Sequence, residues 1–327
     1  MTIEKESDVL KKLKKGVNLL YMHDDADGIA SAVLLSHAFP VKDVFCPEDF
    51  GEWEAKADLS KKYVPPDVCV DMIPKDPEWA GLCIDHHPNH PPSSVRKYTL
   101  VWDGGFPATG IVYNLFKEHI PAEDHWKMVV GLVGDGQADL IPPEIWAKCP
   151  SLLDGYGAVY EKYGKITIYK LPVYLKLSSF INAPCKIPDK WYTGYQVLKN
   201  AKEPLDIIED PALKAAKETV DEEYRRVMRD SAPIEFPNLR VWRISSDYKL
   251  ERTFAWKASE IDQKTCLILN TKTGRMSLRG VLSLVIYEEL KKMNYNINGH
   301  AGFGGGKLTK NQTPEQLVRD LRKIKII

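Results

Sequence analysis

The chain has 327 residues, with 45 lysines and arginines against 45 aspartates and glutamates, so its formal net charge is zero. This balance gives no reason to expect a generally basic surface, so a site for nucleic acid would have to be a local patch. The length allows two domains, the 44% hydrophobic content suits an ordinary globular core, and the sequence has no run of 18 apolar residues to cross a membrane.

The cysteines and the first residues indicate the compartment. The six cysteines are scattered without a C-x-x-C pair, and Cys69 and Cys83 lie in short apolar runs, so we interpret them as buried, reduced thiols. The first segment, MTIEKESDVLKKLKKG, is charged and lacks an apolar stretch, so no signal peptide is expected. The sequence therefore predicts a cytoplasmic protein with no membrane partner.

Short apolar segments alternate with helical patterns through the first 135 residues. The expected strands are 17–22, 41–46, 67–72, 81–86 and 98–102. The expected helices are 27–39, 108–119 and 122–135. Nearly continuous apolar strands that alternate with helices indicate an α/β fold, in which helices cover both faces of a parallel sheet.

The middle of the chain, residues 141–230, has a different pattern. Prolines interrupt it repeatedly, and we expect a series of helices between them. The last part, 211–230, is rich in charge and alanine, which predicts a long, solvated connecting helix. Asp210 is its expected N-cap, and Pro211 stands at the first helical position.

The strand pattern returns after residue 232. The expected strands are 233–236, 239–244, 265–270 and 275–280. A helix at 281–293, a glycine-rich loop at 298–306 and a helix at 313–323 are expected to follow. This part of the chain predicts a second, smaller α/β domain.

Four polar clusters fall where expected strands or helices of the first half end. They are His23/Asp25/Asp27, Asp71, Asp85-His86-His87 and Asp135. Because binding sites of open α/β sheets lie at the carboxyl ends of the strands, we expect these side chains to meet at one crevice.

Cations between these carboxylates would remove their mutual repulsion. Oxygen and imidazole ligands without thiolates suit manganese or magnesium better than zinc. Six or seven ligands are too many for one ion, so two ions are predicted, a common arrangement for hydrolysing phosphate esters. The simpler interpretation is a turn or helix cap for a lone D-x-D, as at Asp24, and a surface position for a lone histidine pair. Recurrence at four element ends favours the metal site.

The motifs HDDADG, an aspartate that ends the next apolar strand (Asp71), DHH and GDG resemble the four motifs of the DHH phosphoesterases. Near the C-terminus, MSLRG and NGHAGFGGGK resemble the type 1 domain associated with that family, as in RecJ-like exonucleases and oligoribonucleases. The resemblance implies a DHH catalytic metal-binding domain at 1–150, a helical region at 151–230 and a substrate-binding associated domain at 231–327. It also implies an active site in the cleft between the outer domains.

The resemblance implies roles for the motif residues of the first domain. One metal is expected to be held by His23 and Asp25, and the other by Asp27, His86 and Asp135. Asp71 is expected to bridge both ions. Asp85 would orient His86 as a partner behind the ligand, and His87 would contact the scissile phosphate. The residues expected to be catalytic are Asp25, Asp71, His86 and His87.

In the associated domain, the resemblance implies that Arg279 and His300 bind substrate phosphate. The glycines Gly304, Gly305 and Gly306 are expected to let backbone N–H groups approach it. The loop departs from the family pattern at Asn298, Phe303 and Gly304, and the sequence GKL after the glycines excludes a P-loop.

The function expected from these features is that of a hydrolase with two ions of Mn²⁺ or Mg²⁺ per active site. It would cleave ends of single-stranded DNA or RNA, or short oligonucleotides. One alternative is a phosphatase for small nucleotides or a cyclic-dinucleotide phosphodiesterase, which fits the lack of an extra nucleic-acid module. An alternative of another class is a non-catalytic replication or repair scaffold. Such relatives typically lose metal ligands, whereas every ligand position is filled here. The choice of DNA or RNA, the polarity, the physiological metal and the oligomeric state remain open.

Overall fold

The computed structural model describes residues 2–3, 6–47, 65–74, 76–88, 90–162, 165–262, 264–300 and 302–324. The chain forms two compact units. The N-terminal unit consists of Met1–Cys185 with Asp189–Lys217, and the C-terminal unit consists of Glu218–Ile327 with Lys186–Pro188. Each unit has hydrophobic clusters of its own.

The N-terminal unit is built on a six-stranded sheet in the order β1-β6-β5-β4-β2-β3. Its strands are β1 (Thr2–Ile3), β2 (Val17–Met22), β3 (Val41–Phe45), β4 (Val68–Val70), β5 (Leu82–Asp85) and β6 (Thr99–Trp102). Strands β2 to β6 run parallel, and the short edge strand β1 pairs antiparallel with β6. Every residue of β4 and β5 is buried, which explains their continuous apolar sequence. The parallel sheet expected from the sequence is confirmed.

One helix lies at the centre of this unit's core. Helix α2 (Ala26–Ala38) is buried along its first ten residues and packs against α4 and α5. Most of its residues are small or apolar, which suits a helix with so little exposed surface. The neighbouring helices are α1 (Glu6–Lys14), α4 (Ala108–Phe116), the 3₁₀ helix η1 (Ala122–Lys127) and α5 (Met128–Gly134).

The proline-rich middle of the chain forms several short helices and one long helix, as expected. They are η2 (Ala138–Leu140), α6 (Pro143–Lys148), η3 (Pro150–Leu153), α7 (Tyr174–Cys185), α8 (Trp191–Asn200), α9 (Pro204–Glu209) and the long helix α10 (Pro211–Asp230). The start of α10 is the expected one, because the Leu213 amide donates to the Asp210 side chain over 2.9 Å.

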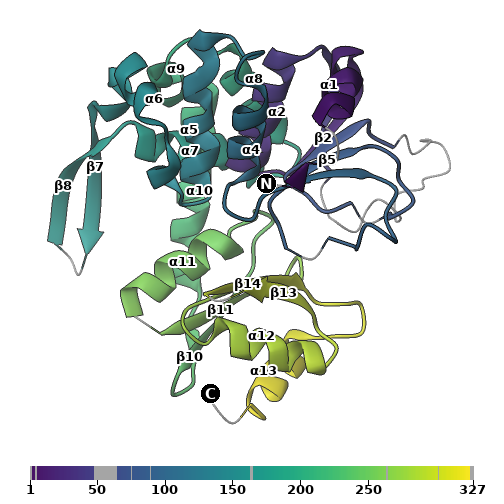
Figure 1. Cartoon of the computed structure of the whole chain (residues 1–327). Helices are drawn as coiled ribbons and strands as arrows, with labels where there is room; N and C mark the ends of the chain where they lie inside the picture. The colour runs from purple at the N-terminus through teal and green to yellow at the C-terminus, as the bar shows by residue number, and fades with distance from the viewer. Residues whose placement is uncertain are drawn as a thin grey trace. The chain divides into compact units, whose positions relative to one another are not determined.

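A hairpin interrupts these helices and corrects the expectation of a purely helical region. Strands β7 (Gly155–Lys162) and β8 (Lys165–Pro172) pair antiparallel as a separate two-stranded sheet (Figure 1). Their sequences, GYGAVYEK and KITIYKLP, are rich in β-branched and aromatic residues, which favour strands over helices. The positions of the prolines, from which the helices were inferred, give no sign of these two strands.

The C-terminal unit has a mixed six-stranded sheet in the order β13-β14-β12-β11-β10-β9. Its strands are β9 (Pro233–Glu235), β10 (Leu239–Ile244), β11 (Thr265–Asn270), β12 (Arg275–Arg279), β13 (Asn296–His300) and β14 (Phe303–Lys307). Its helices are α11 (Glu251–Asp262), α12 (Ser283–Lys292) and α13 (Pro314–Leu321). Strands β10 and β11 are parallel and joined by α11, while the other pairs are antiparallel.

Two features of this unit differ from the expectation. Helix α11 was not predicted, although Leu250, Phe254 and Ala258 repeat every four residues and pack in one cluster. The glycine-rich segment 298–306 is not a loop, because most of it forms the hairpin β13–β14. A Cβ on Gly306 would lie 2.1 Å from the Asn296 carbonyl oxygen. Glycine is needed here because the two strands approach so closely that a side chain would not fit. This requirement outweighs the low strand propensity of glycine.

Among the described residues, no helix has the length and apolar character needed to span a membrane.

Candidate metal centre

The first acidic cluster follows β2 and is ordered by the start of α2. Asp25 is the N-cap of that helix, and its Oδ1 accepts hydrogen bonds from the amides of Asp27 and Gly28, each over 3.1 Å. The other oxygen, Oδ2, lies 3.0 Å from His23 Nδ1. The cap suggested for Asp24 is therefore supplied by Asp25, which still keeps one oxygen directed at His23.

Asp71 follows β4 and adopts a backbone conformation that few residues accept. Its φ is +57°, in the left-handed region, where aspartate and asparagine are tolerated better than other side chains. The carboxylate is buried, with Oδ2 3.3 Å from His23 Nδ1 and Oδ1 3.3 Å from His86 Nε2. Within the described part of the chain, Asp71 Oδ1 has this ion-pair contact with His86 and accepts no hydrogen bond of good geometry. A buried carboxylate oxygen in that position fits a cation as its partner.

Asp27 and Asp135 also lie near His86. Asp135 Oδ2 is 3.3 Å and Asp27 Oδ2 is 3.8 Å from His86 Nε2. The buried Asp27 carboxylate also accepts the amides of Ala108 and Thr109, over 2.8 and 2.9 Å. The N-terminus of α4 therefore holds Asp27 in place, as a helix N-terminus binds an anion.

The glycines of the motif GLVGDG bring Asp135 to this position. A Cβ on Gly131 would lie 2.0 Å from Thr109 Oγ1, and one on Gly134 would lie 2.8 Å from the Ala26 Cβ. Helix α5 therefore packs closely on α2 and α4. Asp135, at the C-terminal end of α5, reaches the carboxyl ends of the strands because of this close packing.

The DHH motif at the end of β5 divides its side chains between two environments. Asp85 is fully buried, and its Oδ1 accepts the His87 Nδ1 proton and the His86 amide, both over 2.8 Å. We expected Asp85 to hold the His86 imidazole, but it contacts the His86 backbone and the His87 imidazole. Adjacent residues of an extended strand point to opposite sides, whereas residues two apart share a side.

Charge crowding controls protonation at this site. Burial lowers the pKa of His23, but the carboxylates of Asp25 and Asp71 outweigh burial and hold that pKa well above its usual value. Burial likewise opposes the charged form of His86, yet the surrounding carboxylates raise its pKa to about 10. The pKa of Asp27 is raised well above its usual value by burial and by the neighbouring carboxylates. Protons on the imidazoles thus partly offset negative charge that a divalent cation would neutralise more completely.

The side chains form sets that could each hold one ion. One set is His23, Asp25 and Asp71, and another is Asp27, His86 and Asp135. Within each set, the potential ligand atoms all lie within 4.8 Å of one another. Asp71 directs one oxygen toward each set, and the donors are oxygen and imidazole nitrogen, so the arrangement fits two neighbouring divalent ions of the manganese or magnesium type.

The residues expected to bind substrate phosphate belong to the C-terminal unit. Arg279 ends β12, and burial together with the nearby Arg252 lowers its pKa to about 10, so it remains charged at neutral pH. The backbone of His300 lies in β13, and its side chain is outside the described part of the structure.

The glycines expected to form a phosphate cradle lie within a strand rather than in a loop. Gly304, Gly305 and Gly306 lie in β14, between β12 and β13, so their backbone groups face strand partners on both sides. Amides used in a sheet are not available to a phosphate.

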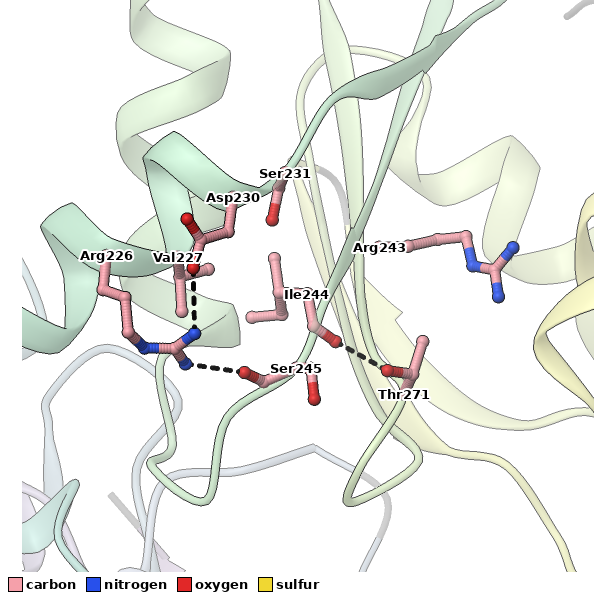
Figure 2. A pocket seen from close by; sticks show the side chains of 8 residues that line it. All are labelled: Arg226, Val227, Asp230, Ser231, Arg243, Ile244, Ser245 and Thr271. Carbon is pink, nitrogen blue, oxygen red and sulfur yellow. Dashed lines mark hydrogen bonds and ion pairs between the residues drawn. The ribbon is translucent and has the colours of Figure 1, made fainter.

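The C-terminal unit also contains a pocket whose lining includes two arginines, as an anion site would require. It has a volume of about 260 Å³ and is lined by Arg226, Val227, Asp230, Ser231, Arg243, Ile244, Ser245 and Thr271 (Figure 2). The Arg226 guanidinium already donates to Asp230 and to the Ser245 carbonyl, and it also pairs with Glu223. Figure 2 shows Arg243 directed away from Arg226. The pocket therefore does not present two converging arginines.

Sequence reasoning missed His90, and the structure shows what Thr109 at the start of α4 contributes. Thr109 anchors Asp27 through its amide and also donates its hydroxyl to the Asp27 carbonyl over 2.9 Å. His90 Nε2 lies 2.9 Å from the second oxygen of Asp85. His90 belongs to none of the clusters predicted at strand ends, so only the tertiary structure connects it to the site.

Comparisons with known proteins show which fold this is. No family model matches the chain, and no curated protein does. Among solved structures, RecJ of Thermus thermophilus in complex with Mn²⁺ has a TM-score of 0.68 at 15% identity, covering 98% of this chain and 54% of that one. This chain thus spans about half the length of that RecJ.

Two further solved structures with a similar fold belong to proteins other than RecJ. CDC45 from Entamoeba histolytica has a TM-score of 0.58 at 10% identity, covering 97% of this chain and 98% of that one. A pGpG-specific phosphodiesterase from Vibrio cholerae has a TM-score of 0.50 at 14% identity, covering 94% and 99%. Because proteins of one fold can differ in activity, these similarities establish architecture rather than function. The chain therefore has the two-part α/β fold of RecJ and other DHH proteins, as its sequence motifs indicated.

Proposed function

We propose that this protein is a phosphodiesterase dependent on two divalent ions, and that it hydrolyses short oligonucleotides or the ends of single-stranded nucleic acids. The observation that carries the proposal is the position of Asp71. Its two carboxylate oxygens lie 3.3 Å from His23 and from His86, which belong to two different sets of potential ligands. A carboxylate shared between two ions is the kind of bridge that a two-metal site needs.

The proposed ligands follow from the sets. His23 and Asp25 would hold one ion, Asp27, His86 and Asp135 the other, and Asp71 both. Bound Mn²⁺ or Mg²⁺ would lower the pKa of a water molecule and stabilise negative charge on the phosphate oxygens.

His87 is the residue proposed to contact the scissile phosphate. Its Nδ1 is engaged by Asp85, so Nε2 is the nitrogen left for the substrate. Burial opposes protonation of His87, but the Asp85 and Asp71 carboxylates raise its pKa above the usual value. A protonated imidazole held in this way can donate a charge-assisted hydrogen bond to a phosphate oxygen or to the leaving group.

The C-terminal unit would supply contacts to the rest of the substrate. We propose that Arg279 binds a phosphate away from the scissile bond, together with His300. This division predicts that longer substrates gain more from the C-terminal unit than small esters do.

A second candidate function is hydrolysis of a dinucleotide. The pGpG-specific phosphodiesterase is nearly fully covered by this chain, so a substrate of two nucleotides is compatible with a protein of this extent. A non-catalytic scaffold is disfavoured, because each of the six proposed ligand positions has a side chain able to bind a metal.

The test is to strip the protein of metal and assay it with Mn²⁺ or Mg²⁺. Labelled single-stranded RNA and DNA from dinucleotides to long oligomers, and pGpG, would be offered and their products resolved. We expect hydrolysis that requires metal, and the preferred length decides between the two substrates. Full activity in excess chelator would contradict the metal mechanism. Two bound ions without hydrolysis of any substrate would favour the scaffold.

A further inference from the structure

A chain of buried side chains runs behind His87, away from the proposed ligands. Asp85 lies at its centre, with Oδ1 bound to His87 and Oδ2 2.9 Å from His90 Nε2. The other nitrogen of His90, Nδ1, lies 3.0 Å from the Tyr98 hydroxyl. The side chain of His90 is only 6% exposed. The chain of contacts is therefore Tyr98–His90–Asp85–His87, and two of its members were not expected from the sequence.

Tyr98 is firmly held at the far end of this chain. It is buried beside Trp79, with ring centroids 5.6 Å apart, and the Arg96 guanidinium lies 5.3 Å from its ring centroid. Arg96 also donates to the Tyr98 carbonyl over 2.8 Å. Burial raises the pKa of the Tyr98 phenol, so the hydroxyl keeps its proton and can act as a donor.

The hydrogen bonds to Asp85 fix the orientation of this carboxylate. The Asp85 carboxylate can only accept, so His90 Nε2 donates to it, and the Tyr98 hydroxyl lies within hydrogen-bonding distance of the other ring nitrogen, Nδ1. Asp85 then accepts three hydrogen bonds, from His90, His87 and the His86 amide. Because both oxygens are engaged, the carboxylate cannot rotate, and the His87 ring is fixed with Nε2 outward.

We propose that His90 and Tyr98 are positioning residues that hold Asp85, and through it His87, in the orientation needed for contact with the scissile phosphate. This inference rests on the proposed function for its effect on catalysis. The arrangement itself stands on the four side chains and the three distances that join them.

A buried metal site is the competing explanation for His90. Cys83, Asp85 and His90 lie close enough to hold an ion. However, the Cys83 thiol donates to the Met72 carbonyl over 3.4 Å, and burial raises its pKa well above the usual value. A thiol that keeps its proton is a poor ligand, so hydrogen bonding explains His90 better.

The kinetic test compares His90→Ala, His90→Gln and Tyr98→Phe with the wild type. Loss of His90 should lower kcat by about ten- to a hundredfold, as is typical when the support of an active-site imidazole is removed, with KM and metal content nearly unchanged. Glutamine can donate from the position of Nε2, so His90→Gln should restore most of the activity. Tyr98→Phe should have a smaller effect, because His90 itself remains.

The matched control is His125, another partly buried histidine of the N-terminal unit paired with a tyrosine. Its Nδ1 lies 3.3 Å from the Tyr113 hydroxyl, and its Nε2 lies 3.1 Å from the Ile120 carbonyl oxygen. His125→Gln and Tyr113→Phe break the same kind of contact away from Asp85. Both should leave kcat unchanged.

A second readout does not depend on activity. In protein loaded with diamagnetic Mg²⁺, the His87 Nδ1 proton should give a protected imidazole signal by NMR. It should broaden or disappear in His90→Ala and persist in His90→Gln and His125→Gln. An unchanged signal and unchanged kcat in His90→Ala would overturn the proposal. So would loss of one bound ion in both His90 variants, which would identify the metal site instead.

These outcomes separate the inference from the proposed function. If the wild type hydrolyses no phosphodiester, the proposed function fails, while the NMR comparison still decides whether His90 and Tyr98 fix His87. If His90→Ala does not fold, His90→Gln and Tyr98→Phe retain the test, because neither opens a large cavity.

Discussion

At the scale of single residues, Asp71 combines a backbone constraint with the central position in the candidate metal site. Its φ of +57° costs an ordinary side chain about 1–2 kcal/mol, but less for aspartate or asparagine. Such strained positions often mark functional sites. Asp71→Asn should therefore keep the backbone and remove only the negative charge, whereas Asp71→Ala should remove the charge and add strain.

We expect both Asp71 variants to lose activity and to bind fewer ions. In the metal-free state, Asp71→Asn should be about as stable as the wild type, because removing one of several crowded carboxylates relieves repulsion. Asp71→Ala should be less stable than Asp71→Asn by about 1 kcal/mol. Metal analysis and urea unfolding measure the two effects. Two tightly bound ions in Asp71→Asn would refute the bridging role.

The raised histidine pKa values predict how metal binding depends on pH. Carboxylates hold the pKa of His86 at about 10 in the metal-free protein, so this imidazole carries a proton at neutral pH that a metal must displace. Mg²⁺ affinity should therefore increase as pH rises toward 10, with at least one proton released per protein. Calorimetry in buffers of different ionisation enthalpy counts these protons, and binding without proton release would show that His86 is not a ligand.

The raised pKa of His86 also predicts how the stability of the metal-free protein depends on pH. His86 has a higher pKa in the folded than in the unfolded chain, where it is near 6.5. Its contribution to stability is therefore complete below about pH 6.5 and is lost as the pH rises through about 10. Thermal midpoints should fall over this window without metal, and saturating Mg²⁺ should reduce the fall.

At the scale of secondary structure elements, the sequence predicted the elements that carry the chemistry better than those that carry none. The ends of β2, β4 and β5 were predicted closely, because buried parallel strands are apolar runs that stop at polar residues. The ligand clusters at those ends followed from the same pattern. The roles of individual side chains were harder to predict. Which histidine Asp85 contacts, for example, depends on the side of the chain to which each residue points.

The elements that were missed are those in which local and tertiary preferences compete. The hairpin β7–β8 lies among proline-interrupted helices, and only its aromatic and β-branched residues indicate strands. The hairpin β13–β14 contains glycines that favour a loop locally, but the close contact of Gly306 with Asn296 requires glycine within a sheet. Neither contact can be inferred from composition alone.

A buried ion pair connects three elements of the N-terminal unit, η1, α8 and α2. Lys127 is 1% exposed, and its Nζ lies 2.8 Å from Asp124 Oδ1 and 2.9 Å from the Lys199 carbonyl oxygen in α8. Asp124 Oδ2 also lies 2.7 Å from His37 Nδ1 in α2. Asp124→Ala leaves the lysine buried and without its counter-charge, so it should cost about 3–5 kcal/mol of stability.

Urea unfolding measures this cost. The matched control is Glu289→Ala, which breaks the pair between Glu289 and Lys292, whose lysine side chain is 68% exposed. That variant should lose no more than about 1 kcal/mol, because water replaces the lost partner. Equal losses in the two variants would show that the Lys127 ammonium reaches water.

At the scale of the whole molecule, the two units are expected to divide the work between chemistry and substrate binding. All proposed ligands lie in the N-terminal unit, and the proposed phosphate-binding arginine lies in the C-terminal unit. A protein organised in this way can change its substrate without changing its metal site. This separation is consistent with one fold being shared by an exonuclease and a dinucleotide phosphodiesterase.

Arg279→Ala tests the division directly. Metal content should remain that of the wild type, because Arg279 contributes no ligand atom. Loss of a charge-assisted phosphate contact should weaken oligonucleotide binding by about 1.5–3 kcal/mol, or roughly ten- to more than a hundredfold. A rise in KM with little change in kcat would mean that the contact is equally strong in the ground and transition states, whereas a lower kcat would place it in the transition state.

An activated aryl phosphodiester without a nucleotide tail should be hydrolysed almost as fast by Arg279→Ala as by the wild type, because it has no second phosphate to bind. The control is Arg243→Ala, which removes an exposed arginine of the same sheet that pairs with Glu315. It should leave both substrates unaffected. If Arg279→Ala slowed the aryl ester and the oligonucleotide equally, or lost its metals, the arginine would act on the reacting centre itself, and the proposed division between the units would be wrong.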